Sequence, residues 1–118
     1  MTAKPSKISK VIFKKAINKA RKVKCRYKIS AIGYDKEFNI LGISVNSFRN
    51  IGRGGFRGVH AEEQLVKRYG KNISYIFIVR TNNQGDILPI VPCDVCKKMC
   101  DKLGIRIISI PPEFKETI

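Results

Sequence analysis

The sequence predicts a three-layer α/β domain, in which a mixed sheet of about four to five strands carries helices on both faces. Two observations lead to this prediction. Segments with apolar residues at helical spacing alternate with short runs rich in Ile, Val and aromatic residues. The run at residues 73–79 is almost continuously apolar, which is typical of a central strand buried on both faces. The 118 residues suit one hydrophobic core, so we expect residues 1–118 to form a single domain.

A basic helix is expected near the N-terminus, at about residues 6–24, with Ser6 as its cap. Lysines fill one side of this segment, and apolar residues recur on the other at spacings of three and four. These apolar residues are Ile8, Val11, Ile12, Ala16, Ala20 and Val23. Two short apolar runs follow at 27–34 and 38–45, separated by three polar residues, and they predict a β-hairpin.

Residues 47–58 contain four glycines, three arginines and two phenylalanines. This composition predicts a flexible loop rather than a helix or strand, and the loop is a candidate for contact with a ligand. Its aromatic and basic residues interleave in a pattern suited to stacking a base and holding phosphates. They are Phe48, Arg49, Arg53, Phe56 and Arg57. The alternative is that the phenylalanines only attach the loop to the core.

The second half of the chain predicts two more helices around the central strand. Helical spacing at 59–69 ends at Gly70, and a third helix at 94–103 ends at Gly104. A last short strand is expected at 105–110, before two prolines. The expected order of elements is therefore α-β-β-α-β-α-β.

The composition is strongly basic, with 24 Lys and Arg residues against 9 Asp and Glu and a formal net charge of +15. Eleven of the basic residues lie between Lys4 and Lys28, and no acidic residue precedes Asp35. This charge indicates a nucleic-acid or nucleotide partner, or alternatively a lysine-rich solvated surface. No apolar run is long enough to span a membrane, and we expect a soluble, cytoplasmic protein without a membrane partner.

A candidate metal site is formed by the only histidine and a pair of cysteines. His60 lies at the start of the second predicted helix, and Cys93 and Cys96 have C-x2-C spacing at the start of the third. Two thiolates and one imidazole give three protein ligands and leave a fourth position open for water, as in catalytic zinc sites. The positive ends of both helix dipoles favour thiolate over thiol there.

Glu62, two residues after His60, is the candidate proton acceptor beside this site. Each feature alone is a weak signal, because a lone histidine often packs in a core and Glu62 with Glu63 could be a solvated face. Their combination is much more specific. Cys100 would permit an iron–sulfur arrangement with Cys93 and Cys96, but His60 would then have no role, so we interpret Cys100 as a buried thiol. Cys25 is interpreted as a core or surface residue.

The motif His60-Ala61-Glu62 followed by Pro92-Cys93-x-x-Cys96 resembles the signature of the zinc-dependent cytidine deaminase superfamily, H-x-E…P-C-x-x-C. The order of elements resembles that family's core over nearly the whole chain. The resemblance implies one Zn²⁺ per chain, bound by the histidine and both cysteines, with Glu62 as the proton shuttle. It also implies that Asn46 contacts the sugar or base of the substrate and that Ala61 forms the floor of the pocket.

The activity implied by this resemblance is hydrolytic deamination of cytosine to uracil, with adenine as the less favoured base. A histidine as the first ligand resembles the nucleotide and polynucleotide branches, so we expect single-stranded DNA or RNA as the substrate. One alternative is a deaminase of free dCMP or CMP, in which a homo-oligomer completes the pocket. Another is a catalytically silent, zinc-stabilised nucleic-acid-binding module, against which the intact Glu62 argues. The chain departs from the family at its C-terminus, where eight residues follow Ile110 and leave little room for a fifth strand.

Overall fold

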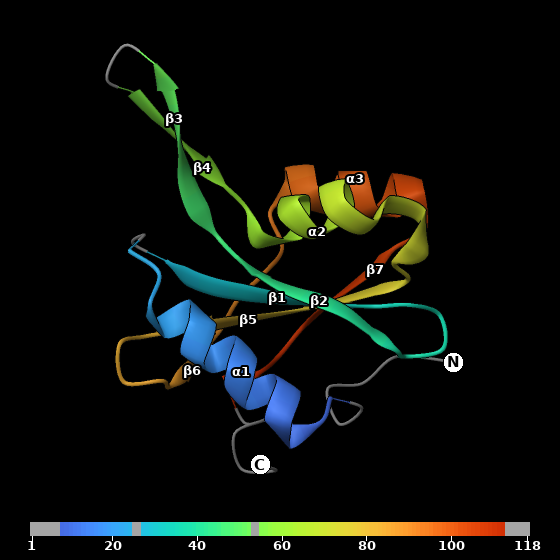
Figure 1. Ribbon diagram of the computed structural model, residues 1–118, viewed down its shortest axis with the longest axis horizontal. Coiled ribbons are helices and arrows are strands. Elements are labelled where there is room, and N and C mark those ends of the chain that lie inside the picture. Colours follow the sequence, from blue (N-terminus) through green and yellow to red (C-terminus); the bar gives the residue numbers. More distant parts are fainter. Residues whose placement is uncertain (1–7, 25–26, 53–54, 113–118) are drawn as a thin grey trace.

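A computed structural model describes residues 8–24, 27–52 and 55–112 (Figure 1). The elements along the chain are α1 (Lys10–Arg21), β1 (Lys28–Tyr34), β2 (Ile40–Val45), β3 (Ser47–Gly52), β4 (Gly55–Val59), α2 (Ala61–Tyr69), the 3-10 turn η2 (Gly70–Asn72), β5 (Tyr75–Thr81), β6 (Ile87–Leu88), α3 (Asp94–Leu103) and β7 (Arg106–Ser109). None of the described helices is long and apolar enough to cross a membrane.

The main sheet is mixed and has five strands, with β5 at its centre. β1 lies between β2 and β5 and is antiparallel to both. The other side of β5 pairs with β7 in parallel and with β6 in antiparallel orientation. Figure 1 shows α1 on one face of the sheet and α2 with α3 on the other. The predicted three-layer α/β fold is therefore confirmed.

Alternate residues of β5 serve the two faces of the sheet, as the two-residue period of a strand requires. Phe77 and Val79 pack in the cluster beneath α1, whereas Ile76 and Ile78 pack in the cluster beneath α2 and α3. All four side chains are fully buried. Burying a side chain of this size stabilises a fold by about 1.5–3 kcal/mol. The prediction of a central strand buried on both faces is confirmed.

Helix α1 is shorter than the predicted range of 6–24. Its N-cap is Ser9, whose Oγ accepts the Ile12 N–H at 3.2 Å, and its C-cap is Lys22. The predicted cap, Ser6, lies outside the described residues. Helices α2 and α3 end at Gly70 and Gly104, as the sequence predicted. These glycines have positive φ values of 51° and 74°. A positive φ costs glycine little, because it has no Cβ.

The hairpin of β1 and β2 is confirmed, but its turn is longer than predicted. Phe38, expected in the second strand, has a φ of 63° and lies in the turn. The Asp35 carboxylate holds this turn by accepting the N–H groups of Glu37 and Asn39, both at 2.9 Å. Such carboxylate contacts with nearby backbone favour a turn over continued strand pairing. The second strand therefore begins at Ile40.

The prediction of a flexible loop at 47–58 is wrong, because this segment forms the antiparallel pair β3 and β4. Ser47 pairs with Val59 at the base of the hairpin, and Gly52 pairs with Gly55 near its tip. Figure 1 shows this ribbon extending away from the main sheet. Hydrogen bonds between main chains hold such a ribbon, so a composition rich in glycine and arginine does not reveal it.

Candidate metal centre

The three predicted ligands lie at the starts of two neighbouring helices on the same face of the sheet. His60 is the N-cap residue of α2, rather than a residue within the helix as the sequence predicted. Cys93 is the N-cap residue of α3, and its sulfur accepts the Cys96 N–H at 3.3 Å. The positive ends of both helix dipoles therefore point toward the ligand group and favour bound thiolates.

The ligand atoms have the spacing that a zinc ion requires. The His60 Nδ1 atom lies 3.4 Å from the Cys93 sulfur and 3.5 Å from the Cys96 sulfur. Zinc bonds of about 2.3 Å to sulfur and about 2.0 Å to nitrogen at tetrahedral angles separate the two atoms by about 3.5 Å. All three ligand atoms lie within 4.8 Å of one another. The group could hold one zinc ion, as predicted, with His60 bound through Nδ1.

In the absence of a cation, the buried sulfur atoms are held as thiols. Burial raises the pKa of the Cys96 thiol, and the charge of the Glu62 carboxylate raises it further. Burial also raises the pKa of Cys100 to about 11, with a second contribution from Glu62. A bound divalent cation reverses this preference at its ligands, because a coordinating thiol is deprotonated. The local chemistry therefore favours cysteine ionisation only together with metal binding.

Glu62 is a buried carboxylate beside the ligand group. Its side chain is 4% exposed, whereas Glu63 is half-buried. The Glu62 charge raises the pKa of both Cys96 and Cys100. Glutamate is rarely buried to this extent in a protein. The role predicted for Glu62 as a proton acceptor stays a prediction.

Asn46 lies at the end of β2, where its side chain bonds the main chain of the β1 region. Its Oδ1 atom accepts the Ile29 N–H at 2.9 Å, and its Nδ2 atom donates to the Tyr27 carbonyl at 2.6 Å. These contacts fasten the end of β2 to the start of β1. The predicted contact of Asn46 with a substrate stays a prediction.

Gln64 bonds the end of β2 to α2, and the sequence analysis did not single it out. Its side-chain amide donates to the Val45 carbonyl at 2.6 Å and contacts the Ser47 hydroxyl at 3.4 Å. Its backbone N–H bonds the His60 carbonyl in the first turn of α2. Gln64 therefore connects the helix that carries the ligand His60 to the end of β2. Its position one helical turn after the histidine was the only signal in the sequence.

The other predicted substrate-contacting residues lie on the hairpin and in the core. Ala61 is fully buried in the cluster beneath α2 and α3, together with Ile78 and Cys100. The strand register pairs Arg49 with Arg57. Phe48 lies on β3 and Phe56 on β4, while Arg53 lies outside the described residues. Contact of these six residues with a substrate stays a prediction.

Cys100 is a buried thiol, as predicted. Its side chain is 1% exposed, and it belongs to the cluster around Leu65 and Ile78. The metal-binding group found in the described part of the chain consists of the histidine with Cys93 and Cys96, and it does not include Cys100. The iron–sulfur alternative is therefore not supported. Cys25 lies outside the described residues.

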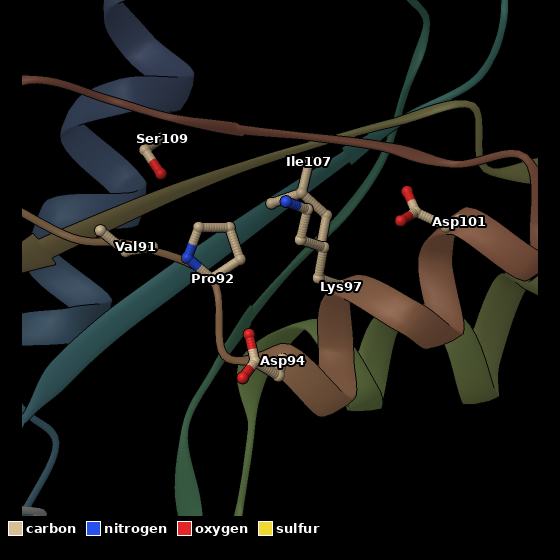
Figure 2. A pocket seen from close by; sticks show the side chains of 7 residues that line it. All are labelled: Val91, Pro92, Asp94, Lys97, Asp101, Ile107 and Ser109. Carbon is tan, nitrogen blue, oxygen red and sulfur yellow. The ribbon is translucent and has the colours of Figure 1, made fainter.

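A pocket of about 280 Å³ lies between α3 and β7 (Figure 2). Figure 2 shows Lys97 reaching from α3 toward Ile107, with Asp94 and Asp101 before and after it along the helix. Neither the metal ligands nor Glu62 line this pocket. Pro92, which lines the pocket, precedes Cys93, so the pocket lies near the ligand group but is separate from it.

The fold and the ligand group together define a three-layer α/β domain with a candidate zinc centre between two helix starts. No protein-family model and no curated protein sequence matches the chain. Its structure is similar to the crystal structure of cytidine deaminase from Mycobacterium leprae, with a TM-score of 0.54 and 17% identity over 90% of this chain and 91% of that one. Cytidine deaminase from Mycobacterium tuberculosis gives a TM-score of 0.56 and 16% identity over 90% and 88%. The chain therefore has the fold of these cytidine deaminases, as the resemblance in the sequence implied.

Proposed function

We propose that this protein is a zinc-dependent hydrolytic deaminase that converts cytosine to uracil, preferentially in single-stranded nucleic acid. One observation carries the proposal: three ligand atoms match the spacing of a zinc site, and a buried glutamate lies in the first turn of the helix that begins at His60. Three protein ligands are typical of catalytic zinc, whereas structural zinc is closed by four. The similar structures of cytidine deaminases support the same reaction.

The chain's own residues have distinct roles in this reaction. His60 Nδ1 and the sulfur atoms of Cys93 and Cys96 hold the metal. A zinc ion held there would supply an activated water for hydrolysis. Glu62 accepts a proton at its carboxylate and delivers it to the exocyclic amino nitrogen of the base, so that ammonia leaves. Water and cytosine are thereby converted to uracil and ammonia. Gln64 positions the ligand-bearing helix against the end of β2.

The preference for nucleic acid rests on charge. The net charge of +15 attracts a polyanion, and the basic hairpin of β3 and β4 leads directly into His60. A single strand suits this site because a base in a duplex must first be unstacked and extruded. DNA and RNA fulfil these requirements equally.

The second candidate is a deaminase of a free cytosine nucleoside or nucleotide. It is favoured by the similar solved structures, which are cytidine deaminases and are covered by this chain over about nine-tenths of their length. A silent zinc-binding module is less favoured, because such a module would have no use for a buried carboxylate beside the metal ligands.

The test is incubation of the zinc-loaded protein with cytidine, dCMP, single-stranded DNA and single-stranded RNA, followed by measurement of uracil. The expected result is uracil in at least one of the two oligonucleotides, with a higher kcat/KM than for the small substrates. The Glu62→Ala variant, also zinc-loaded, is the matched control. Absence of uracil from all four substrates would contradict the deaminase proposal, and turnover of dCMP alone would select the second candidate.

A further inference from the structure

A groove lined by three lysines lies at the C-terminal end of α1. Its volume is about 310 Å³. It is lined by Lys19, Lys22, Val23, Lys24, Val45, Asn46 and Ser47. We call it the lysine groove. One wall is the last turn of α1 with the residues that follow it, and the other wall is the junction of β2 and β3.

The three lysines are available for a ligand. Lys19, Lys22 and Lys24 are all exposed. Within the described part of the chain, none of them has an acidic partner. The C-terminal end of a helix dipole stabilises such cations, so their accumulation costs the fold little. The groove is therefore a concentrated positive site whose charge is not used by the structure itself.

The lysine groove is next to the candidate metal centre. Ser47, on the groove wall, pairs with Val59, the residue that precedes the ligand His60. Gln64 of α2 bonds the wall residues Val45 and Ser47. The wall of the groove is thus tied by hydrogen bonds to the first turn of the helix that begins at His60. The groove and the candidate metal centre are therefore linked through the junction of β2 and β3.

An aromatic side chain adjoins the same wall. Tyr27 is 47% exposed, and the Arg80 guanidinium lies 4.5 Å from the centre of its ring. The Tyr27 carbonyl accepts the side-chain amide of Asn46, which lines the groove. A cation at this distance holds the ring in place. The main chain of Tyr27 is thus bonded to a residue of the groove, and proteins bind single strands by combining exposed aromatic rings with cations.

We propose that the lysine groove binds the phosphates of a single-stranded polynucleotide whose cytosine occupies the metal centre, and that Tyr27 stacks on a neighbouring base. This inference rests on the proposed function and names its substrate class more closely. A membrane surface fits less well, because the apolar residues Phe13, Ala16 and Ala20 of α1 are buried in the domain and not available for insertion.

The test compares two triple variants, both made in a Glu62→Ala background so that the substrate is not consumed. The groove variant carries Lys19→Gln, Lys22→Gln and Lys24→Gln. The control variant carries Lys67→Gln, Lys71→Gln and Lys102→Gln, which remove the same charge from exposed positions in the last turns of α2 and α3 and in η2. The dissociation constant of a short cytosine-containing DNA strand is measured over a salt series, and thermal unfolding shows that both variants are folded.

The groove variant is expected to bind about tenfold or more weakly, and the slope of log Kd against log salt is expected to fall by about 2, at about 0.7 for each lost phosphate contact. The control variant is expected to keep most of both the affinity and the slope. Tyr27→Ala is expected to weaken binding by about tenfold, whereas Tyr27→Phe retains the stacking surface and the affinity.

Equal losses of affinity in the two triple variants would overturn the proposal, because binding would then depend on the net charge and not on the lysine groove. Binding of anionic lipid vesicles without binding of the DNA strand would overturn it as well. The Glu62-intact protein separates the two proposals. If it turns over dCMP but binds no oligonucleotide, the groove proposal fails while the deaminase stands. If it produces no uracil but binds the strand through the groove, the deaminase proposal fails while the groove stands.

Discussion

The face of the sheet beneath α1 is packed by large aromatic and aliphatic side chains, whereas the face beneath α2 and α3 combines aliphatic side chains with thiols and a carboxylate. On the first face, Tyr34 packs edge-on against Phe77 with ring centres 5.6 Å apart. On the second, Leu65 and Ile78 share their cluster with Cys100, and Glu62 is buried close by. The same strands thus serve a purely structural layer and a layer with reactive groups.

This difference follows from where the helices begin. Both helices of the second face start beside each other, with His60 and Cys93 as their N-cap residues. The positive dipole ends at these starts favour thiolate over thiol at the cysteines, and thiolates in turn attract a cation. Helix α1 instead lies along the sheet and buries its apolar side. We therefore expect substitutions beneath α1 to change stability and substitutions at the starts of α2 and α3 to change chemistry.

The largest expected effect is the loss of metal in the His60→Ala variant. The unaltered protein should contain about one zinc per chain and be colourless, because zinc has no redox chemistry or visible absorbance. Removing one of three protein ligands should leave the purified variant with almost no zinc. Cys100→Ala, the matched control on the same face, should keep its zinc. Metal analysis of the three proteins checks this, and iron with visible absorbance would instead support the iron–sulfur arrangement.

The next largest effect is expected for Glu62→Ala, which tests chemistry without removing a ligand. A proton shuttle typically contributes about 10²–10⁴-fold to turnover. The variant should therefore lose about this factor in kcat while it retains zinc and its thermal stability. Glu63→Ala is the control, since Glu63 is only half-buried. Undiminished turnover in the Glu62 variant would show that another group moves the proton.

The sequence predicted the grouping of His60, Cys93 and Cys96 because its signals are local. His60 is the only histidine in the chain, and the C-x2-C spacing precedes a helix whose bounds were predicted to the residue, from Asp94 to Leu103. Gly104, with its left-handed backbone, marks the end of this helix. Such signals depend on neighbours within a few residues. For the same reason, the lone histidine and the close spacing of the two cysteines were enough to predict a candidate metal site.

The parts that the sequence did not predict depend on distant contacts. The pairing of β3 with β4 needs main-chain bonds across the hairpin, which the composition of 47–58 conceals. The lysine groove lies between the end of α1 and the junction of β2 and β3. Lys24 and Ser47, which are distant in the sequence, therefore line the same groove. Ser9 replaces the predicted Ser6 as helix cap. Neighbouring serines offer similar local signals, and packing of the buried Ile8 beside the cap helps to select between them.

A matched pair of core variants sharpens the contrast between the faces. Phe77→Ala beneath α1 should lower the free energy of unfolding by about 3–5 kcal/mol, and Leu65→Ala beneath α2 by about 2–5 kcal/mol. Both side chains are fully buried. At a temperature where both variants are folded, Phe77→Ala should retain its turnover, whereas Leu65→Ala should lose part of it because Leu65 supports the helix that carries Glu62. Urea unfolding and kcat measurements check this, and equal losses of turnover would contradict the division between the faces.

A smaller effect is expected from the pH dependence of the metal-free protein. The pKa of Cys100 is raised from 9.0 to about 11 in the fold, so the thiol's contribution to stability is complete below pH 9 and is lost as the pH rises toward 11. This loss amounts to up to about 3 kcal/mol at 1.36 kcal/mol per pH unit. Urea unfolding at several pH values should show a steeper decline for the unaltered protein than for Cys100→Ala. Parallel curves would show that the thiol is not desolvated.

The smallest expected effect concerns the turn that positions one aromatic side chain on the α1 face. The Phe38 ring stacks on Tyr75 with ring centres 4.4 Å apart, although Phe38 has a left-handed backbone. Hydrogen bonds from the Asn39 and Glu37 backbone lower the pKa of the Asp35 carboxyl, so its contribution to stability is present above pH 3.8 and is lost as the pH falls below it. Asp35→Ala should remove this pH dependence and weaken the stacking, while Asp35→Asn keeps the Oδ1 acceptor and should have the smaller effect. Because this turn belongs to the structural face, neither variant should alter the zinc content, and a loss of zinc from Asp35→Ala would show that the two faces are coupled through the sheet.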